Sequence, residues 1–451
     1  MRAGTFALAI VLAGAGAARS QPVTPAIPPL PLMNMLPAAD QPLPGGAAVS
    51  QPLQPVDPPA NLPPAVVPTV DPPESTVIKP QVNERNAQTG KVLGNWWDSD
   101  ELLIWWPKAH PLPPLITASR GSVPAYGLST TTLLAGNRAI ETQDFAGYRL
   151  THGWSLNSED TLGFEGRYFF LGTRTFSASA TDLGDDRSNT IGLSFRNALT
   201  GQEDALSLAR AGQSSALTTV YTSTRVQGAE ANFIGNLYAS GGVKVHAIAG
   251  YRFFQANEGL RVESQWLQYP TPESAFNKTF GMIADQIDAH NEFHGGQLGL
   301  MADAHRGQFY VEFTGKAALG TNFEMVRIDG ATHLITANYP VPLLQSFHGG
   351  VYAQGTNIGR FTRPAFAVVP EGMLKVGLKL GDRGRFYVGY NFLYISDAVR
   401  PGDQIDRTIN PTQIPLLARG LPFAGPESPQ PAIVRTDFWT QGLLIGFEAR
   451  F

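Results

Sequence analysis

Two histidines four residues apart, His290 and His294, have the spacing most suggestive of chemistry in this chain. On a helix this spacing places two imidazoles on one face, where they can share a zinc ion. No third ligand stands nearby, and the segment has the pattern of a strand rather than a helix. We therefore interpret the pair as ordinary histidines at a strand end and predict no metal site.

Carboxylates gather at two places, 98–101 and 182–186, and oxygen clusters of this kind can bind calcium. The first group follows Trp96 and Trp97, which favours a strand beginning at a membrane interface. The second falls in a long connection and is interpreted as a solvated loop. His246 has no Ser or Asp partner nearby in sequence, so we predict no catalytic centre and no cofactor.

Charged residues of both signs recur at every second position of several segments, opposite large apolar side chains. If those segments are strands, the charges share the inner face of a barrel. They would line a channel or form ion pairs that close the interior, and the sequence leaves both open. The predicted lumen-lining residues are Glu165, Arg167, Glu230, Lys244, Arg252, Glu312, Lys316, Lys375, Lys379 and Arg385.

The final segment of the chain, 439–451, is the clearest of these alternating stretches. Trp439, Phe447 and Phe451 fall on an apolar face, and Thr440, Gly442 and other small or polar residues separate them. One face in lipid and one in a polar interior produce this pattern in outer-membrane strands. We predict that these three aromatic residues form a membrane-insertion signal that barrel-assembly machinery reads.

Nine further segments show the same period of two, which makes ten predicted strands. They are 101–106, 145–156, 161–171, 229–238, 243–254, 293–303, 309–319, 366–380 and 385–395. Short connections alternate with long ones near 107–144, 172–218, 257–289, 324–363 and 397–434. Short periplasmic turns and long external loops produce this alternation. The pattern predicts an antiparallel up-and-down transmembrane β-barrel of about 10–14 strands, allowing for hairpins hidden in the loops, with both termini in the periplasm.

The front of the chain has a different composition. Residues 1–20 combine Arg2, an apolar stretch and a run of small residues, which predicts a secretory signal peptide. Half of the 36 prolines lie in 21–80, a segment without aromatic residues, so it cannot form a helix or a central strand. We predict a disordered periplasmic tether over 21–90, a plain spacer or a contact to the cell wall, and a barrel over 91–451.

The overall composition excludes several classes of protein. The chain has no cysteine, so it has no disulfide framework and no thiol nucleophile. Its net charge of −4 gives no electrostatic basis for binding nucleic acid. No stretch is apolar enough for a membrane-spanning helix.

Several motifs occur in order along the chain, such as Leu-Leu-Ile-Trp-Trp at 102–106, Phe-His-Gly-Gly-Gln-Leu-Gly at 293–299 and Val-Gly-Tyr-Asn-Phe-Leu-Tyr at 388–394. Further such segments are 111–115, 228–232, 249–252, 356–360 and 399–406. Together they resemble the putative beta barrel porin-7 family, which is known mainly from planctomycetes. The resemblance runs in order from about residue 96 to 451, and the polar pair Gln255-Ala256 departs from it where an apolar residue is expected. It implies an outer-membrane β-barrel and carries over no catalytic or substrate residues.

Two functions are consistent with these patterns. The first is a porin for passive passage of small solutes, favoured by the charged inner face. The second is a structural or adhesion barrel that presents external loops, is tethered to the wall and has no open channel. Ten to twelve strands make a barrel narrow enough for side chains to fill.

Overall fold

The structure is a computed structural model, and it describes residues 96–451 apart from 138–143, 158, 160, 271–277, 338–341, 382 and 419–421. The signal peptide and the proline-rich tether predicted from the sequence lie outside the described residues. Strands dominate the described chain, and none of its helices is long and apolar enough to cross a membrane.

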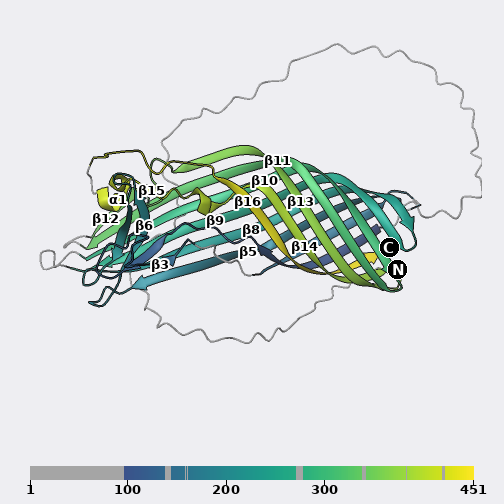
Figure 1. Cartoon of the computed structure of the whole chain (residues 1–451), viewed down its shortest axis with the longest axis horizontal. Helices are drawn as coiled ribbons and strands as arrows, with labels where there is room; N and C mark the ends of the chain where they lie inside the picture. Colours follow the sequence, from purple (N-terminus) through teal and green to yellow (C-terminus); the bar gives the residue numbers. More distant parts are fainter. Residues whose placement is uncertain are drawn as a thin grey trace, which may run out of the picture. The chain divides into compact units, whose positions relative to one another are not determined.

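Ten strands form a closed antiparallel ring (Figure 1). The sheet has 11 strands, but β12 pairs only with the end of β11, and the pairing of β10 with β11 closes the ring formed by the others. The barrel strands are β1 (Trp96–Pro107), β4 (Phe145–Ser155), β5 (Leu162–Asp182), β8 (Ser214–Ser240), β9 (Val243–Gln268), β10 (Lys278–Arg306), β11 (Phe309–Ala337), β13 (Gly359–Leu380), β14 (Gly384–Val399) and β16 (Arg435–Arg450). Each predicted strand is present, and the predicted all-β barrel is confirmed.

The period-two pattern explains the ring, because successive side chains of a strand point to opposite faces. Large apolar residues cover the outside of the barrel over part of its length, and their side chains are exposed. We call this band the apolar belt, and in β11 it runs from Phe309 to Phe323. Its further members include Leu150, Trp154, Phe170, Phe233, Tyr251, Leu298, Phe366, Leu374, Val376, Val388, Tyr390, Leu443, Ile445 and Phe447.

One end of the barrel, the terminal end, carries the C-terminus and tight turns such as Gly241-Gly242 and Gly307-Gln308. The opposite end, the loop end, is built by much longer strands. β8 to β11 have 27, 26, 29 and 29 residues, whereas β1 and β4 have 12 and 11. The barrel therefore extends well past the apolar belt on one side.

The long loops predicted at 257–289 and 324–363 are in large part strand. The reason is an inversion of polarity at the edge of the belt. Up to Phe253 the outward residues of β9 are apolar, whereas the outward residues from Gln255 to Gln265 are polar and their inward neighbours include Leu260 and Val262. This reversal is expected where water replaces lipid outside a barrel. Inside, an apolar core replaces the polar interior. The departure at Gln255-Ala256 marks this crossing.

A second sheet at the loop end completes this apolar core inside the extended strands. Its strands are β2 (Ile116–Ser119), β3 (Thr131–Ala135), β6 (Thr190–Asn197), β7 (Glu203–Ala209) and β15 (Thr408–Ile409). Residues such as Ile116, Leu193 and Phe195 pack with Val262 and Ile283 of the barrel strands. We call this sheet the cap; β12 (Leu343–His348), η4 (Pro401–Gln404), η5 (Pro411–Gln413) and α1 (Pro415–Ala418) complete the elements between the barrel strands.

Candidate functional site in the barrel interior

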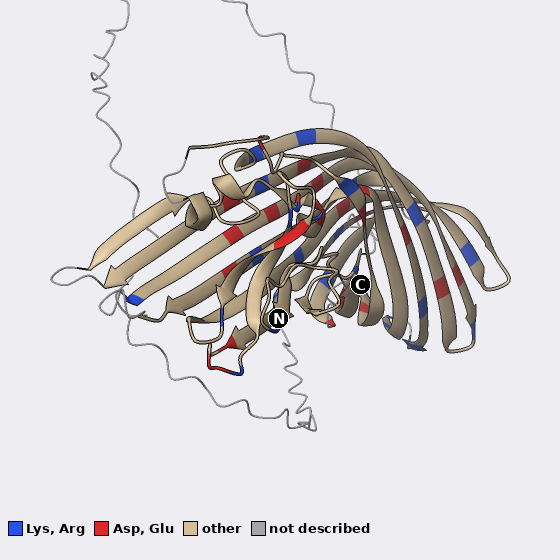
Figure 2. Ribbon diagram, turned by 60° about the vertical axis from the view of Figure 1, so that its left-hand side comes forward, with Lys and Arg blue, Asp and Glu red and all other residues tan. Residues whose placement is uncertain are grey.

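Strand register places opposite charges beside one another inside the apolar belt. Glu101 of β1 faces Arg149 of β4, and Lys316 of β11 faces Glu371 of β13. Other cross-strand pairs of opposite charge are Arg167 with Glu230, Glu230 with Arg252, and Glu312 with Lys375. Directly opposite charges on one face of a sheet attract. Figure 2 shows acidic and basic positions on neighbouring strands of the barrel.

Glu371 joins charges from opposite walls of the ring. It forms ion pairs with Arg252 of β9 and with Lys316, whose Nζ lies 3.1 Å from Oε2. Arg149, on the other side of the ring, lies 3.8 Å away, and Asn391 donates a hydrogen bond of 2.9 Å to Oε1. β4, β9 and β13 are not adjacent in the sheet, so these contacts cross the lumen.

Glu230 is a second acidic centre beside Glu371 in the barrel interior. Arg252 and Lys316 approach its carboxylate to 2.8 and 2.6 Å, and Asn232 and Gln297 donate hydrogen bonds of 3.1 and 3.0 Å. All five side chains are buried. Buried charges are tolerated only when they are paired and hydrogen-bonded, and this centre meets that condition.

A third cluster lies around Glu101. Lys375 reaches Oε1 at 2.8 Å, Arg149 reaches Oε2 at 3.0 Å, and the hydroxyl of Tyr387 donates a hydrogen bond of 2.9 Å. Lys375 also lies 3.7 Å from Glu312. Arg167 and Glu165 form a further ion pair at 3.3 Å. We name the three clusters and this pair together the ionic layer: Glu101, Arg149, Glu165, Arg167, Glu230, Arg252, Glu312, Lys316, Glu371 and Lys375.

The predicted lumen-lining residues divide between this layer and the terminal end. Seven of them belong to the ionic layer, where Arg167 is partly buried and the other six are buried. Lys244 instead is exposed and Lys379 half-buried beside the short turns of the terminal end. Arg385 is also half-buried and pairs with Asp303 at 3.4 Å and Glu448 at 3.8 Å.

Three members of the layer, Glu101, Arg149 and Glu371, were absent from the predicted set. Glu371 lies an even number of residues from Lys375, and Arg149 shares a face with Gly147 and Thr151. Alternation alone therefore placed both on the inner face. Glu101 falls within the predicted interfacial cluster with Asp98 and Asp100, although its odd separation from Asp98 puts the two on opposite faces. The structure buries Glu101 and leaves Asp98 toward the outside, beside His152.

An apolar layer lies next to the ionic layer. Arg149 lies over the ring of Trp105, 5.3 Å from its centroid, and Trp105 packs against Phe169. Phe254 and Phe293 belong to the same buried cluster. Large side chains from several walls of a narrow barrel thus meet in its interior.

A buried latch fastens two connecting segments beyond the apolar layer. Arg400, just before η4, binds Glu258 of β9 through two nitrogens at 2.7 and 2.8 Å. The same guanidinium donates to the backbone carbonyls of Lys108 and Ala109 at 2.9 and 2.6 Å. His110 donates to or accepts from Thr224 at 2.6 Å. The chain that follows β1 and the chain that follows β14 are therefore held against the inner wall.

The other candidates from the sequence are dispersed. His290 and His294 lie on the outward face of β10, and His294 contacts Glu292 and Tyr251. Within the described residues no group of three His, Asp or Glu has metal-binding geometry. Asp182 accepts hydrogen bonds from the backbone N–H groups of Gly184 and Asn189.

The aromatic residues of the terminal strand lie on its outside. Phe447 is exposed in the apolar belt, and Trp439 stacks on Phe392 with ring centroids 6.5 Å apart. Phe451 stacks on Trp96 at 3.9 Å, and its N–H donates to the carbonyl of Trp96. The end of the chain is thereby joined to the first barrel strand.

Among solved structures, the chain is similar to the outer membrane protease OmpT of Escherichia coli, at 10% identity, covering 80% of this chain and 98% of that one, with a TM-score of 0.39. It is also similar to a FadL homologue of Pseudomonas aeruginosa, at 6% identity, covering 80% and 90% of the two chains, with a TM-score of 0.20. No curated protein sequence matches the chain.

The family comparison covers nearly all of the described chain. The model of the putative beta barrel porin-7 family matches residues 97–451, from the start of β1 to the last residue. This stretch contains all ten barrel strands, the ionic layer and the cap. The chain therefore belongs to the putative beta barrel porin-7 family and is an outer-membrane β-barrel.

Proposed function

We propose that this protein is a closed barrel that anchors a rigid platform in the outer membrane, without passive passage of solutes. The platform consists of the cap and the extended ends of β8 to β11. Of the two functions considered from the sequence, this is the structural or adhesion barrel. The observation that carries the proposal is the set of ion pairs that Glu371 makes with Arg252 and Arg149 across the lumen.

Burial of the charged groups supports closure. A water-filled pore keeps its lining charges hydrated and free to meet ions. Here Arg252, Lys316 and Glu371 are each 5% exposed or less and are paired with one another. The apolar layer around Trp105 and the latch around Arg400 add two further barriers along the same axis.

The platform favours a function at the loop end of the barrel. The apolar core that joins the cap to the extended strands fixes the cap as a defined surface. We further propose that the loop end is external and both termini are periplasmic, because the tight turns gather beside the C-terminus. Catalysis and cofactor binding are not part of this proposal.

Conductance in a planar lipid bilayer tests closure. The purified full chain is inserted, and vesicle flotation together with heat-modifiable gel migration verifies that it is folded in the membrane. We expect the membrane current to stay at the level of the protein-free bilayer in simple salt solutions. Regular single-channel steps from protein that passes both insertion checks would overturn the proposal in favour of a passive pore.

A further inference from the structure

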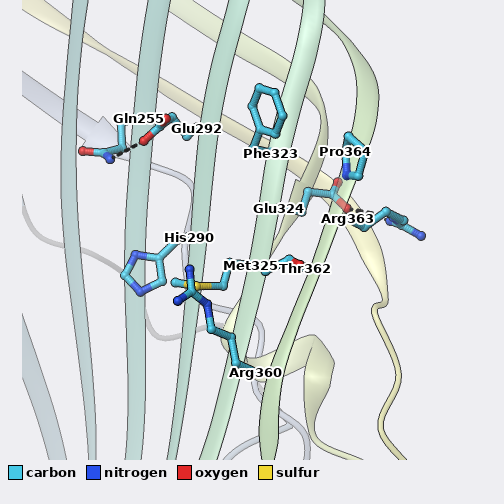
Figure 3. A pocket seen from close by; sticks show the side chains of 10 residues that line it. All are labelled: Gln255, His290, Glu292, Phe323, Glu324, Met325, Arg360, Thr362, Arg363 and Pro364. Atoms are coloured by element: carbon cyan, nitrogen blue, oxygen red, sulfur yellow. Dashed lines mark hydrogen bonds and ion pairs between the residues drawn. The ribbon is translucent and has the colours of Figure 1, made fainter. Parts of the chain in front are cut away.

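A groove crosses the outer surface of β10, β11 and β13 just beyond the apolar belt. It consists of two adjoining hollows of about 450 and 530 Å³ that share His290, Met325 and Arg360. Figure 3 shows the Arg360 side chain extending past Met325 toward His290. The groove lies on the outer surface of the barrel, so the ionic layer inside does not account for it.

The groove is continuous with the apolar belt at its lower end. Phe323 of β11 is 51% exposed and faces Pro364 of β13, and Phe366 next to it is 67% exposed. Four residues farther along each strand, Arg327 faces Arg360. That step is about 13 Å along a strand and less along the membrane normal, because barrel strands are tilted. Apolar and cationic surfaces thus adjoin at the depth of lipid headgroups.

The two arginines form an unfavourable pair on their own. Like charges directly opposite one another on a sheet repel. Arg327 pairs with Asp329 at 3.1 Å, but both side chains are largely exposed, and the structure records no ion pair for Arg360 among the described residues. An anionic group between Arg327 and Arg360 would remove the repulsion and give Arg360 a partner.

The upper end of the groove is acidic. Asp329 follows Arg327 on β11, and Asp288 of β10 faces Arg327 in register. On β11 and β13 the lining from the belt outward is therefore apolar, then cationic with the hydroxyl of Thr362, then acidic at Asp329; on β10, Glu292 faces Phe323 and Asp288 faces Arg327. A lipid whose phosphate joins its acyl chains to a terminal amine presents the complementary sequence of groups.

We propose that this groove binds one zwitterionic phospholipid of the leaflet at the loop end, with a phosphoethanolamine headgroup. Arg360 and Arg327 bind its phosphate, and Asp329 with Asp288 accepts hydrogen bonds from its ammonium group. The acyl chains descend over Met325, Phe323 and Phe366 into the belt.

Native mass spectrometry of the full chain in detergent tests the proposal. The protein is titrated with phosphatidylethanolamine, phosphatidic acid and diacylglycerol of identical chains. We expect phosphatidylethanolamine to bind most tightly, phosphatidic acid less tightly and diacylglycerol most weakly. Arg360→Gln should weaken both phosphate lipids about tenfold, the loss of one hydrogen bond between charged groups. Asp329→Asn should weaken phosphatidylethanolamine alone.

Arg261→Gln is the matched control, because Arg261 is an outward arginine beyond the belt on β9 and pairs with Glu263 at 2.8 Å outside the groove. It should leave all three affinities unchanged. Equal binding of phosphatidylethanolamine by the parent and Arg360→Gln would refute the site. Equal binding of diacylglycerol would reduce it to nonspecific apolar adhesion, and full displacement by equimolar phosphoethanolamine would make it a site for a soluble phosphate ester.

Discussion

At the residue scale, Glu371 has the most consequential set of contacts. Its carboxylate pairs with Lys316 of the adjacent strand and with Arg252 across the lumen, and it lies near Arg149 of the opposite wall. A buried ion pair adds little net stability compared with apolar residues of the same shape. Removing one partner, however, leaves an unpaired charge in the interior. Glu371 therefore matters more through the cost of its loss than through the strength of each pair.

Replacing Glu371 by Ala should lower the free energy of unfolding by about 3–5 kcal/mol, because Arg252 and Lys316 then compete for Glu230 alone. Urea unfolding of the barrel in lipid vesicles, followed by tryptophan fluorescence, measures the loss.

Arg435→Gln provides the comparison. Arg435 pairs with Asp397 at 3.2 Å, but its side chain is 49% exposed, so the change should cost less than about 1 kcal/mol. Similar losses in the two variants would mean that the ionic layer is hydrated rather than buried.

At the scale of elements, the extended ends of β10 and β11 hold the segment before β13. Asp285 of β10, past the apolar belt, accepts hydrogen bonds from the backbone N–H groups of Val351, Tyr352 and Ala353 at 3.1, 3.0 and 2.8 Å. The hydroxyl of Tyr352 donates to the carbonyl of Ser194 in the cap at 2.9 Å. Asp285 thus links the barrel wall to the cap through one short segment.

This carboxyl should make stability depend on pH. Burial raises the pKa of Asp285 to about 7, although the three N–H donors act in the opposite direction. An unfolded Asp has a pKa of about 3.9, so between these values the folded state binds a proton that the unfolded state has lost. The contribution of Asp285 to stability is therefore full below about pH 4 and falls as the pH rises to about 7.

Unfolding midpoints in urea at several pH values between 4 and 8 measure this effect. The parent should lose stability across the window relative to Asp285→Asn, which carries no titrating group at this position. Parallel curves for the two proteins would show that the carboxylate is ionised throughout and that the N–H donors outweigh burial.

At the scale of the whole molecule, the distribution of elements predicts the orientation in the membrane. The cap and the long strand ends occupy one end, and the tight turns and the C-terminus occupy the other (Figure 1). Outer-membrane barrels turn their short connections to the periplasm. Gly121 and Gly307 lie in exposed turns of the two ends, with open space around them.

An epitope inserted at Gly121 should be labelled by antibody on intact cells, whereas the same epitope at Gly307 should be labelled only after the outer membrane is permeabilised. Heat-modifiable migration of both insertion variants controls for folding. Labelling of the Gly307 insertion on intact cells, with the Gly121 insertion protected, would reverse the orientation.

The ten strands and the position of the apolar belt could be predicted from the sequence alone. Alternation is a local property, since each residue faces away from its neighbours along the strand. Phe447, Val388 and Phe313 could be assigned to the outside without knowledge of any partner strand. The same alternation assigns Lys316 and Lys375 to the inner face.

What those inner charges do, and where the strands end, depends on the folded ring. Arg149 and Arg252 meet Glu371 only because the ring brings strands far apart in sequence to face each other across a narrow lumen. The strands continue beyond Gln255 because the cap supplies an apolar core inside the barrel. Beyond this point the apolar residues of a strand face inward, whereas within the apolar belt they face outward. A pattern local to one strand contains neither the opposite wall nor the cap, so pore and closed barrel looked alike in the sequence.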